Sequence, residues 1–267
     1  MLRHLRLLGS FIKFSLLGEM AFRANYLIKV VVEVLWLVLM IVFYVTLFRN
    51  TKAVAGWTEY QYFFFLGCFY ALEGVVETLF MNNFNEFGEL VRKGDLDLIL
   101  LQPVDEQFMV SFRSFEWATV PNVIMGAGMM TYAAWHLHAP LNLESVGGFV
   151  IGLICALAIA YSFMLMLAST AVWLIRNQSL YELWWLFTSL MRYPRQIFEQ
   201  MAWARPIGWF FTFVIPVLLA IYVPASSMVR VLERGMLLYA IGSAIVLLWI
   251  SRQVFRRALR SYRSASS

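Results

Sequence analysis

Long apolar stretches separated by short polar ones constrain this chain more than any other feature of its sequence. Of its 267 residues, 61% are hydrophobic and only 14% are charged. An ordinary soluble domain carries about 25% charged residues, so this chain lacks the polar surface that would keep it in water. Its length allows roughly six apolar helices of about 20 residues, the length that crosses a bilayer. The sequence therefore predicts an all-α integral membrane protein.

The predicted spans are the apolar stretches long enough to cross a bilayer. We place them at residues 27–48, 60–80, 113–135, 147–175 and 236–250. The fourth ends at a polar stop, residues 176–178. The region from residue 179 to 229 is harder to assign, because Pro216 interrupts its most apolar part and proline breaks a helix.

Lysine and arginine gather at the two ends of the chain. Residues 1–26 carry too many charges to span, and Arg3, Arg6 and Lys13 recur at helical spacing, so we expect an interfacial helix on lipid. Residues 251–267 form a basic tail. Because cytosolic segments are enriched in Lys and Arg, this pattern predicts cytosolic termini and an even number of spans. The net charge of +5 thus reflects topology and lipid contact, and we expect no nucleic acid partner.

The polar segment after the second predicted span, residues 81–107, combines charged and apolar side chains in an unusual way. Between residues 88 and 104 the two kinds alternate, and the segment ends near a proline. Such a surface suits either docking on another protein or lying on lipid headgroups. The residues that we single out are Glu89, Arg92, Lys93, Gly94, Asp95, Leu96, Asp97, Leu100 and Pro103. On a helix that begins after Gly94, Leu96 and Leu100 would form one apolar ridge.

The run VRKGDLDLILLQPVD resembles the cytosolic loop of membrane permeases of type-2 ABC exporters, in the family of single-domain, six-span bacterial subunits. Residues 91–103 carry the pattern of that family without a gap: basic residues, glycine, an acid, Leu, Asp, a short apolar run and proline. The run FVIPVLLAIYVPAS, at residues 213–226, and the spacing of the spans also match. The similarity thus covers nearly the whole chain.

The resemblance implies a single transmembrane permease domain, residues 1–267, with six spans in the bacterial plasma membrane. It implies pairing with a second copy or a sister permease, and two separate ATPase subunits that contact the loop after the second span. It also implies a fifth span and a re-entrant hairpin bent at Pro216. The residues alone leave another interpretation open, an interfacial helix at 180–191 followed by a span at 207–223.

No phosphate-binding loop, dinucleotide fingerprint or nucleophile elbow occurs in the sequence, so ATP hydrolysis would need a separate subunit. We accordingly expect neither enzyme activity nor a cofactor. His136 and His138 have no third ligand nearby, so we expect no metal site. Cys68 and Cys155 lie in separate apolar runs as small apolar residues. The substrate stays open among drugs, lipids, peptides and glycans.

Charged residues inside spans are costly and therefore mark candidate functional positions. Lys29 and Glu33 lie four apart in the first span, and Glu73 and Glu77 lie four apart in the second. Since these two spans run in opposite directions, we expect Lys29 and Glu77 at similar depth, joined as an ion pair. The rival function is an ion-driven secondary transporter that uses Glu73 and Glu77, and a membrane-embedded enzyme comes third.

Overall fold

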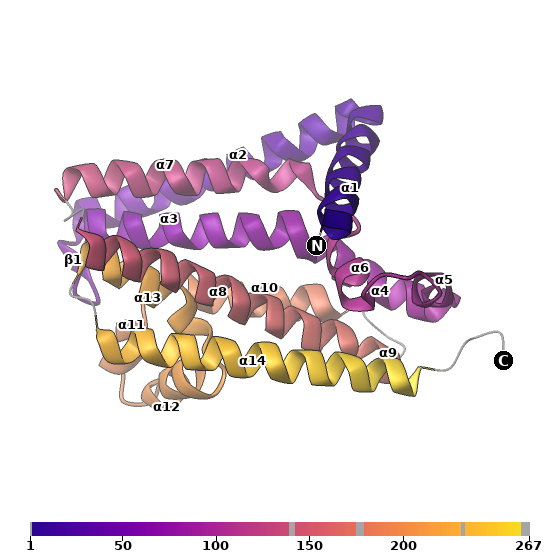
Figure 1. Cartoon of the computed structure of the whole chain (residues 1–267). Helices are drawn as coiled ribbons and strands as arrows, with labels where there is room; N and C mark the ends of the chain where they lie inside the picture. The colour runs from indigo at the N-terminus through magenta and orange to yellow at the C-terminus, as the bar shows by residue number, and fades with distance from the viewer. Residues whose placement is uncertain (1, 139–141, 175–178, 231–232, 263–267) are drawn as a thin grey trace.

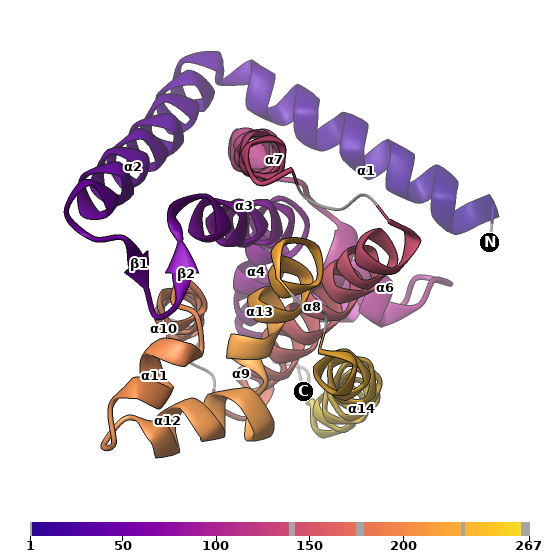
Figure 2. The same cartoon turned by 90° about the vertical axis from the view of Figure 1, so that its left-hand side faces the viewer.

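The apolar stretches fold into long helices that run side by side along one axis (Figure 1). This computed structural model describes residues 2–138, 142–174, 179–230 and 233–262. The helices along the axis are α2 (Arg23–Asn50), α3 (Glu59–Val76), α7 (Val120–His136), α8 (Leu143–Ser169) and α14 (Arg234–Ser261). Seen down the axis, α7 lies inside the angle formed by α2 and the N-terminal helix α1 (Leu2–Ala21) (Figure 2).

Within the described residues, four helical stretches are long and apolar enough to cross a membrane. They are Arg23–Asn50, Glu59–Lys93, Leu143–Leu174 and Arg234–Ser261. These stretches coincide with the predicted spans at residues 27–48, 60–80, 147–175 and 236–250, the third of them as far as residue 174, and so confirm a helical chain with several potential membrane crossings. The predicted polar stop at residues 176–178 lies outside the described residues.

The third predicted span, residues 113–135, differs from the structure at its start. Residues 113–116 are not helical, and α7 begins at Val120 after a 3-10 turn, η2 (Trp117–Thr119). The backbones of α3 and α7 touch, because a Cβ on Gly126 would lie 2.5 Å from the nitrogen of Ala71. Glycine allows this close approach between neighbouring apolar helices.

The region from residue 179 to 229 forms short helices and one sharp bend. They are α10 (Ser179–Met191), α11 (Gln196–Gln200), α12 (Arg205–Trp209), the π-helical turn η3 (Phe210–Val214) and α13 (Val217–Val229). An angle of 82° separates Arg205–Val214 from Val217–Val229, at the position where Pro216 predicted an interruption. Nearly every residue of α13 is buried, and α13 packs against α8 and α3. The irregular backbone at the bend therefore leads directly into a helix enclosed by protein.

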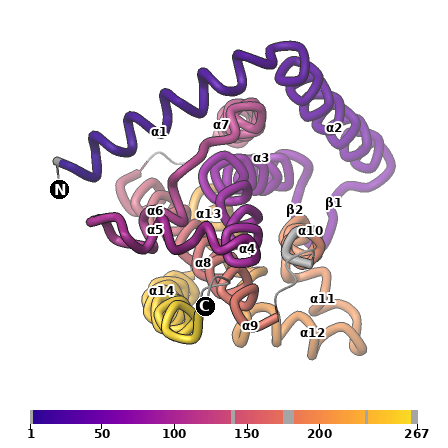
Figure 3. Tube along the Cα trace, turned by 90° about the vertical axis from the view of Figure 1, so that its right-hand side faces the viewer, coloured from indigo at the N-terminus to yellow at the C-terminus, as the bar shows by residue number. Residues whose placement is uncertain are grey.

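The helix that begins as α3 continues well beyond the predicted end of the second span. It passes through a π-helical turn, η1 (Glu77–Met81), into α4 (Asn82–Lys93), for 35 residues in all. Two short helices follow, α5 (Leu96–Leu100) and α6 (Glu106–Phe112). The predicted loop at residues 81–107 is thus mostly helical. Helices α1, α4, α5 and α6 gather at one end of the bundle (Figures 1 and 3).

The opposite end of the bundle carries the short connections. A two-residue hairpin turn at Ala55 and Gly56 joins β1 (Ala53–Val54) to β2 (Trp57–Thr58), which pair antiparallel. Both turn residues have positive φ, 52° and 78°, as a type I′ hairpin turn requires. Helices α11 and α12 lie toward this end, whereas α9 (Ala171–Leu174) lies near the other (Figure 1). One end of the bundle thus carries the β-hairpin with α11 and α12, and the other carries α1 with α4, α5 and α6.

Candidate functional site

Gly94 ends the long helix and redirects the chain into the segment with the unusual pattern. Its φ is +80°, a left-handed conformation that glycine adopts without strain. Helix α5 follows, and Pro103 lies exposed in the turn before α6. Asp105 caps α6, since its carboxylate accepts a hydrogen bond of 3.0 Å from the N–H of Phe108. Residues 94–112, called the tip below, thus form two short helices joined by a turn at the end of the long helix α3–α4.

The apolar ridge predicted at Leu96 and Leu100 faces the interior of the protein. Leu96 is 0% exposed and Leu100 is half-buried, so the side chain of Leu96 offers no surface for docking in this structure. The exposed leucines of this tip are Leu98 and Leu101, at 64% and 82%. The reason is the phase of α5: residues 96 and 99 pack on the core, which turns residues 98 and 101 outward.

Charged side chains of α4 line one hollow together with Leu98. Glu89 lies 2.5 Å from Arg92 and 3.6 Å from Lys93, one turn away on α4. The hydrogen bond from Arg92 lowers the pKa of Glu89 below its usual value, and the charge of Lys93 adds to this effect. Asp95 is exposed, whereas Asp97 is half-buried. A hollow of about 690 Å³ lies between α4 and the α5–α6 tip. The tip thus offers apolar contact, charge and concave shape together.

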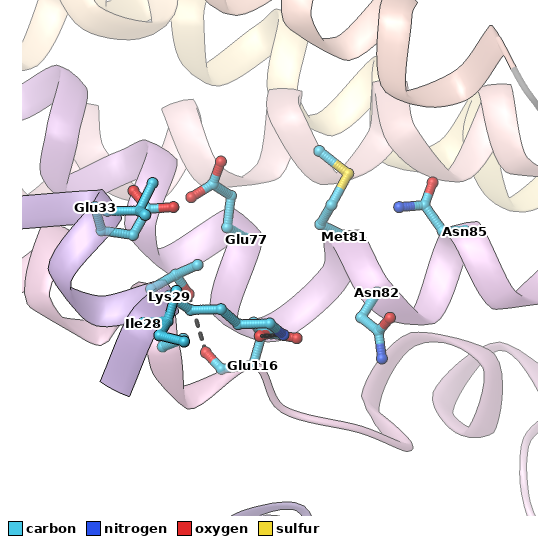
Figure 4. A pocket seen from close by; sticks show the side chains of 11 residues that line it. Ile28, Lys29, Glu33, Glu77, Met81, Asn82, Asn85 and Glu116 are labelled. Carbon is cyan, nitrogen blue, oxygen red and sulfur yellow. Dashed lines mark hydrogen bonds and ion pairs between the residues drawn. The ribbon is translucent and has the colours of Figure 1, made fainter. Parts of the chain in front are cut away.

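A second candidate site is a polar cavity of about 360 Å³ between α2 and the long helix α3–α4 (Figure 4). Its walls come from α2, from η1 and α4, and from the chain just before α7. The residues that line it are Ile28, Lys29, Val32, Glu33, Glu77, Met81, Asn82, Asn85, Glu116, Ala118 and Thr119. Carboxylates in an otherwise apolar bundle make this cavity a functional candidate.

The predicted ion pair between Lys29 and Glu77 is wrong. The ammonium of Lys29 lies 2.6 Å from the carboxylate of Glu116 instead (Figure 4). Helix α2 contacts η2 and α7, and this position brings Lys29 to the chain before α7. Both Lys29 and Glu77 still line the cavity, as the shared depth predicted.

The other predicted charges find partners that sequence reasoning missed. Glu33 accepts a hydrogen bond of 2.9 Å from Asn122 of α7. Glu73 lies 3.9 Å from Arg192, which follows α10 and whose guanidinium also sits over the ring of Phe69 at 5.2 Å. Asn122 could have been identified from the sequence, because it is a polar residue inside an apolar run. Arg192 offered no such signal, because it lies in the region with two interpretations.

His136 and the two cysteines take part in ordinary packing. His136 stacks on the ring of Tyr60, with 4.6 Å between centroids and 7° between planes. Cys68 and Cys155 are buried and free. Across the described residues, no group of three or more His, Cys, Asp or Glu side chains is placed to hold a metal ion.

A comparison with known families decides what kind of membrane protein this is. Residues 34–266 match the family model described as "ABC-2 family transporter protein". The chain belongs to this ABC-2 transporter family. The match confirms the resemblance found in the sequence and makes this permease a multi-pass membrane component of an ABC transport system. It gives no support to an ion-driven secondary transporter. No curated protein and no solved structure matches the chain significantly.

Proposed function

We propose that this permease is one membrane half of an ATP-driven exporter. It pairs with a second copy or a sister permease, and two separate ATPase subunits bind at the α4–α6 end. The observation that carries the proposal is the tip itself, where Leu98 and Leu101 are exposed and Leu98 lines one hollow with Glu89 and Lys93 of α4. In protein interfaces, exposed apolar residues supply affinity, and charges around them set register and partner choice.

The same end of the bundle carries features expected at the cytosolic side of a bacterial plasma membrane. Helix α1 crosses this end, with basic residues exposed alongside Phe14, Leu17 and Met20, which suits an interfacial helix on lipid headgroups (Figure 3). The basic end of α14, which bears Arg256 and Arg257, lies there too (Figure 1). Residues 263–267 of the predicted basic tail lie outside the described residues. Excess Lys and Arg at one end supports cytosolic termini.

Arginines at the opposite end do not oppose this topology. Arg195 lies 3.4 Å from Glu233 and 3.7 Å from Glu199, and Arg192 is near Glu73. Pairing reduces the cost of keeping these cations on the outer side. It supports the six-span arrangement in which α10 belongs to a fifth span and the bent pair around Pro216 forms a re-entrant hairpin. Pro216 at the bend is buried and leads into the buried helix α13, which agrees with the rule that irregular backbone at membrane depth is enclosed by protein.

The long helix gives the tip a mechanical route into the bundle. Since α3, η1 and α4 form one helix of 35 residues, force on α5 acts at the end of a rod that lines the polar cavity. Movement of the ATPase subunits would thereby shift the permease between inward-open and outward-open states.

The test replaces Leu98 and Leu101 together with Ser. Both side chains are exposed, so we expect a folded, membrane-inserted permease that no longer co-purifies with its ATPase. The matched control is Leu143→Ser, since Leu143 is 91% exposed on α8 at the other end. Affinity purification from native membranes, followed by measurement of ATP hydrolysis in nanodiscs, provides the readout. Full ATPase binding by the double Ser variant would refute docking at this tip.

A further inference from the structure

Residues 113–117, named here the strap, connect α6 to α7 without regular helical hydrogen bonds at their centre. On one side they bind the long helix. The N–H of Ser114 donates to the side chain of Asn83 at 2.8 Å, and the amide of Asn83 donates back to the Ser114 carbonyl at 2.7 Å. The N–H of Glu116 donates to the Thr78 carbonyl at 3.1 Å. Since Asn83 is buried, this side of the strap is fixed to η1 and α4.

On its other side the strap binds α1. The N–H of Phe115 donates to the hydroxyl of Ser15 at 3.0 Å, and the N–H of Trp117 donates to the carboxylate of Glu19 at 2.7 Å. Ser15 and Glu19 lie four residues apart, so they occupy one face of α1. Backbone N–H groups that lack helical partners are thus satisfied by a helix far away in the sequence. Helix α1, which lies at the end of the bundle, is therefore hydrogen-bonded to the strap.

Helix α2 is tied to the strap by its charge. Lys29, which lies in the first third of α2, forms its 2.6 Å ion pair with the strap residue Glu116. The described side chains of α2 that are buried are Leu37, Tyr44 and Phe48, all of them in its later part. Near the strap, α2 is held by the Lys29–Glu116 ion pair and by its contact with η2, without a buried side chain of its own among the described residues, whereas toward its far end buried side chains hold it.

We propose that the strap is a latch that holds an arm, made of α1 and α2, against the long helix α3–α4. When the latch bonds break, the end of α2 nearest α1 moves away from η1 and widens the polar cavity that Glu33 and Glu77 line. Tyr44 and Phe48, which pack on Tyr62, keep the far end in place and make it the pivot. The cause of release rests on the proposed function: α6 leads directly from the docking tip into the strap.

The latch is tested by spin-label distances in the permease alone, in nanodiscs, so that no ATPase is needed. The labels replace Val31 on α2 and Ile154 on α8, both exposed, in a background with Ala at the two native cysteines. Latch variants are Lys29→Met and the double variant Ser15→Ala/Glu19→Ala. Each should raise the population of a longer distance at least about twofold to fivefold, as loss of a half-exposed ion pair predicts.

Two controls separate release from unfolding. Lys29→Arg keeps the cation and should restore the wild-type distances. Glu144→Gln removes an exposed 2.8 Å ion pair with Arg234 at the other end and should change nothing. Latch variants that give the same distances as wild type overturn the proposal, as does a longer distance that Lys29→Arg fails to suppress. If instead the wild-type permease binds no ATPase, the proposed function fails while the latch result stands.

Discussion

The substitutions Leu96→Ala and Leu98→Ala should have opposite consequences, although the two residues are neighbours on the same short helix. Leu96 is 0% exposed, so truncation leaves a cavity in the packing between α5 and the core and should lower the free energy of unfolding by about 2–5 kcal/mol. Leu98 is 64% exposed, and its truncation should change that free energy by no more than about 0.5 kcal/mol. The two substitutions should therefore affect different properties. Leu96→Ala lowers the stability of the fold, and Leu98→Ala weakens ATPase binding.

The assay is a denaturant titration of each variant in detergent, paired with ATPase co-purification from the same preparation. Because α5 lies beyond the long helix at the end of the bundle, aqueous burial energies apply to it. A stable Leu96→Ala variant that fails to bind the ATPase would refute the orientation of α5. Equal destabilisation by both substitutions would show that both faces of α5 are packed, and would refute an exposed Leu98.

Three further outcomes are expected. Gly126→Ala should cost about 1–3 kcal/mol of stability, measured in the same titration, because its methyl group would force α7 away from α3. A double-mutant cycle with Lys29→Met and Glu116→Gln should give a coupling energy of about 0.5–1 kcal/mol, as for a half-exposed ion pair, and additive losses would deny the pair. Cysteine labelling of intact cells should reach a substitution at Lys52 but not one at Lys93, and labelling of the latter would reverse the topology.

Local chemistry in the sequence predicted the turns and breaks well. A short helix was expected to begin after Gly94, and α5 does begin at Leu96, after Gly94 turns the chain with a positive φ. Pro216 predicted an interruption, and the bend is there. Both results follow from the backbone of a single residue, because glycine accepts left-handed φ and proline lacks an N–H. The size of the bend, 82°, depends on how α13 packs among its neighbours, which no local pattern reveals.

The orientation of side chains across helices was harder to predict. Spacing placed Leu96 and Leu100 on one face, but it could not say which face of a five-residue helix meets the core. Likewise, depth in the membrane predicted that Lys29 and Glu77 share a level, and both do line one cavity. The partner of Lys29 is Glu116 because α2 contacts the chain before α7, a tertiary position that spacing along one helix does not contain.

The start of α7 shows the same limit. The apolar stretch that predicted the third span reached back to residue 113, whereas residues 113–116 are non-helical because distant side chains satisfy N–H groups of the strap. Ser15, Glu19 and Asn83 supply these bonds from segments that the sequence pattern does not connect. Irregular backbone of this kind is stable only when such partners exist. Hydrophobic periodicity cannot detect them.

The π-helical turn η1 links the cavity to the docking tip. A π turn adds a residue to a helix and disturbs its regular i to i+4 bonding, which is why such turns are frequent at functional sites. In this permease, the turn places Glu77 in the cavity and leaves the Thr78 carbonyl to accept the N–H of Glu116 in the strap. One irregular turn therefore serves the cavity wall and the latch together. Under the proposed function, force applied at α5 would reach this turn along α4 and also through α6 and the strap, so both routes would end on the same cavity.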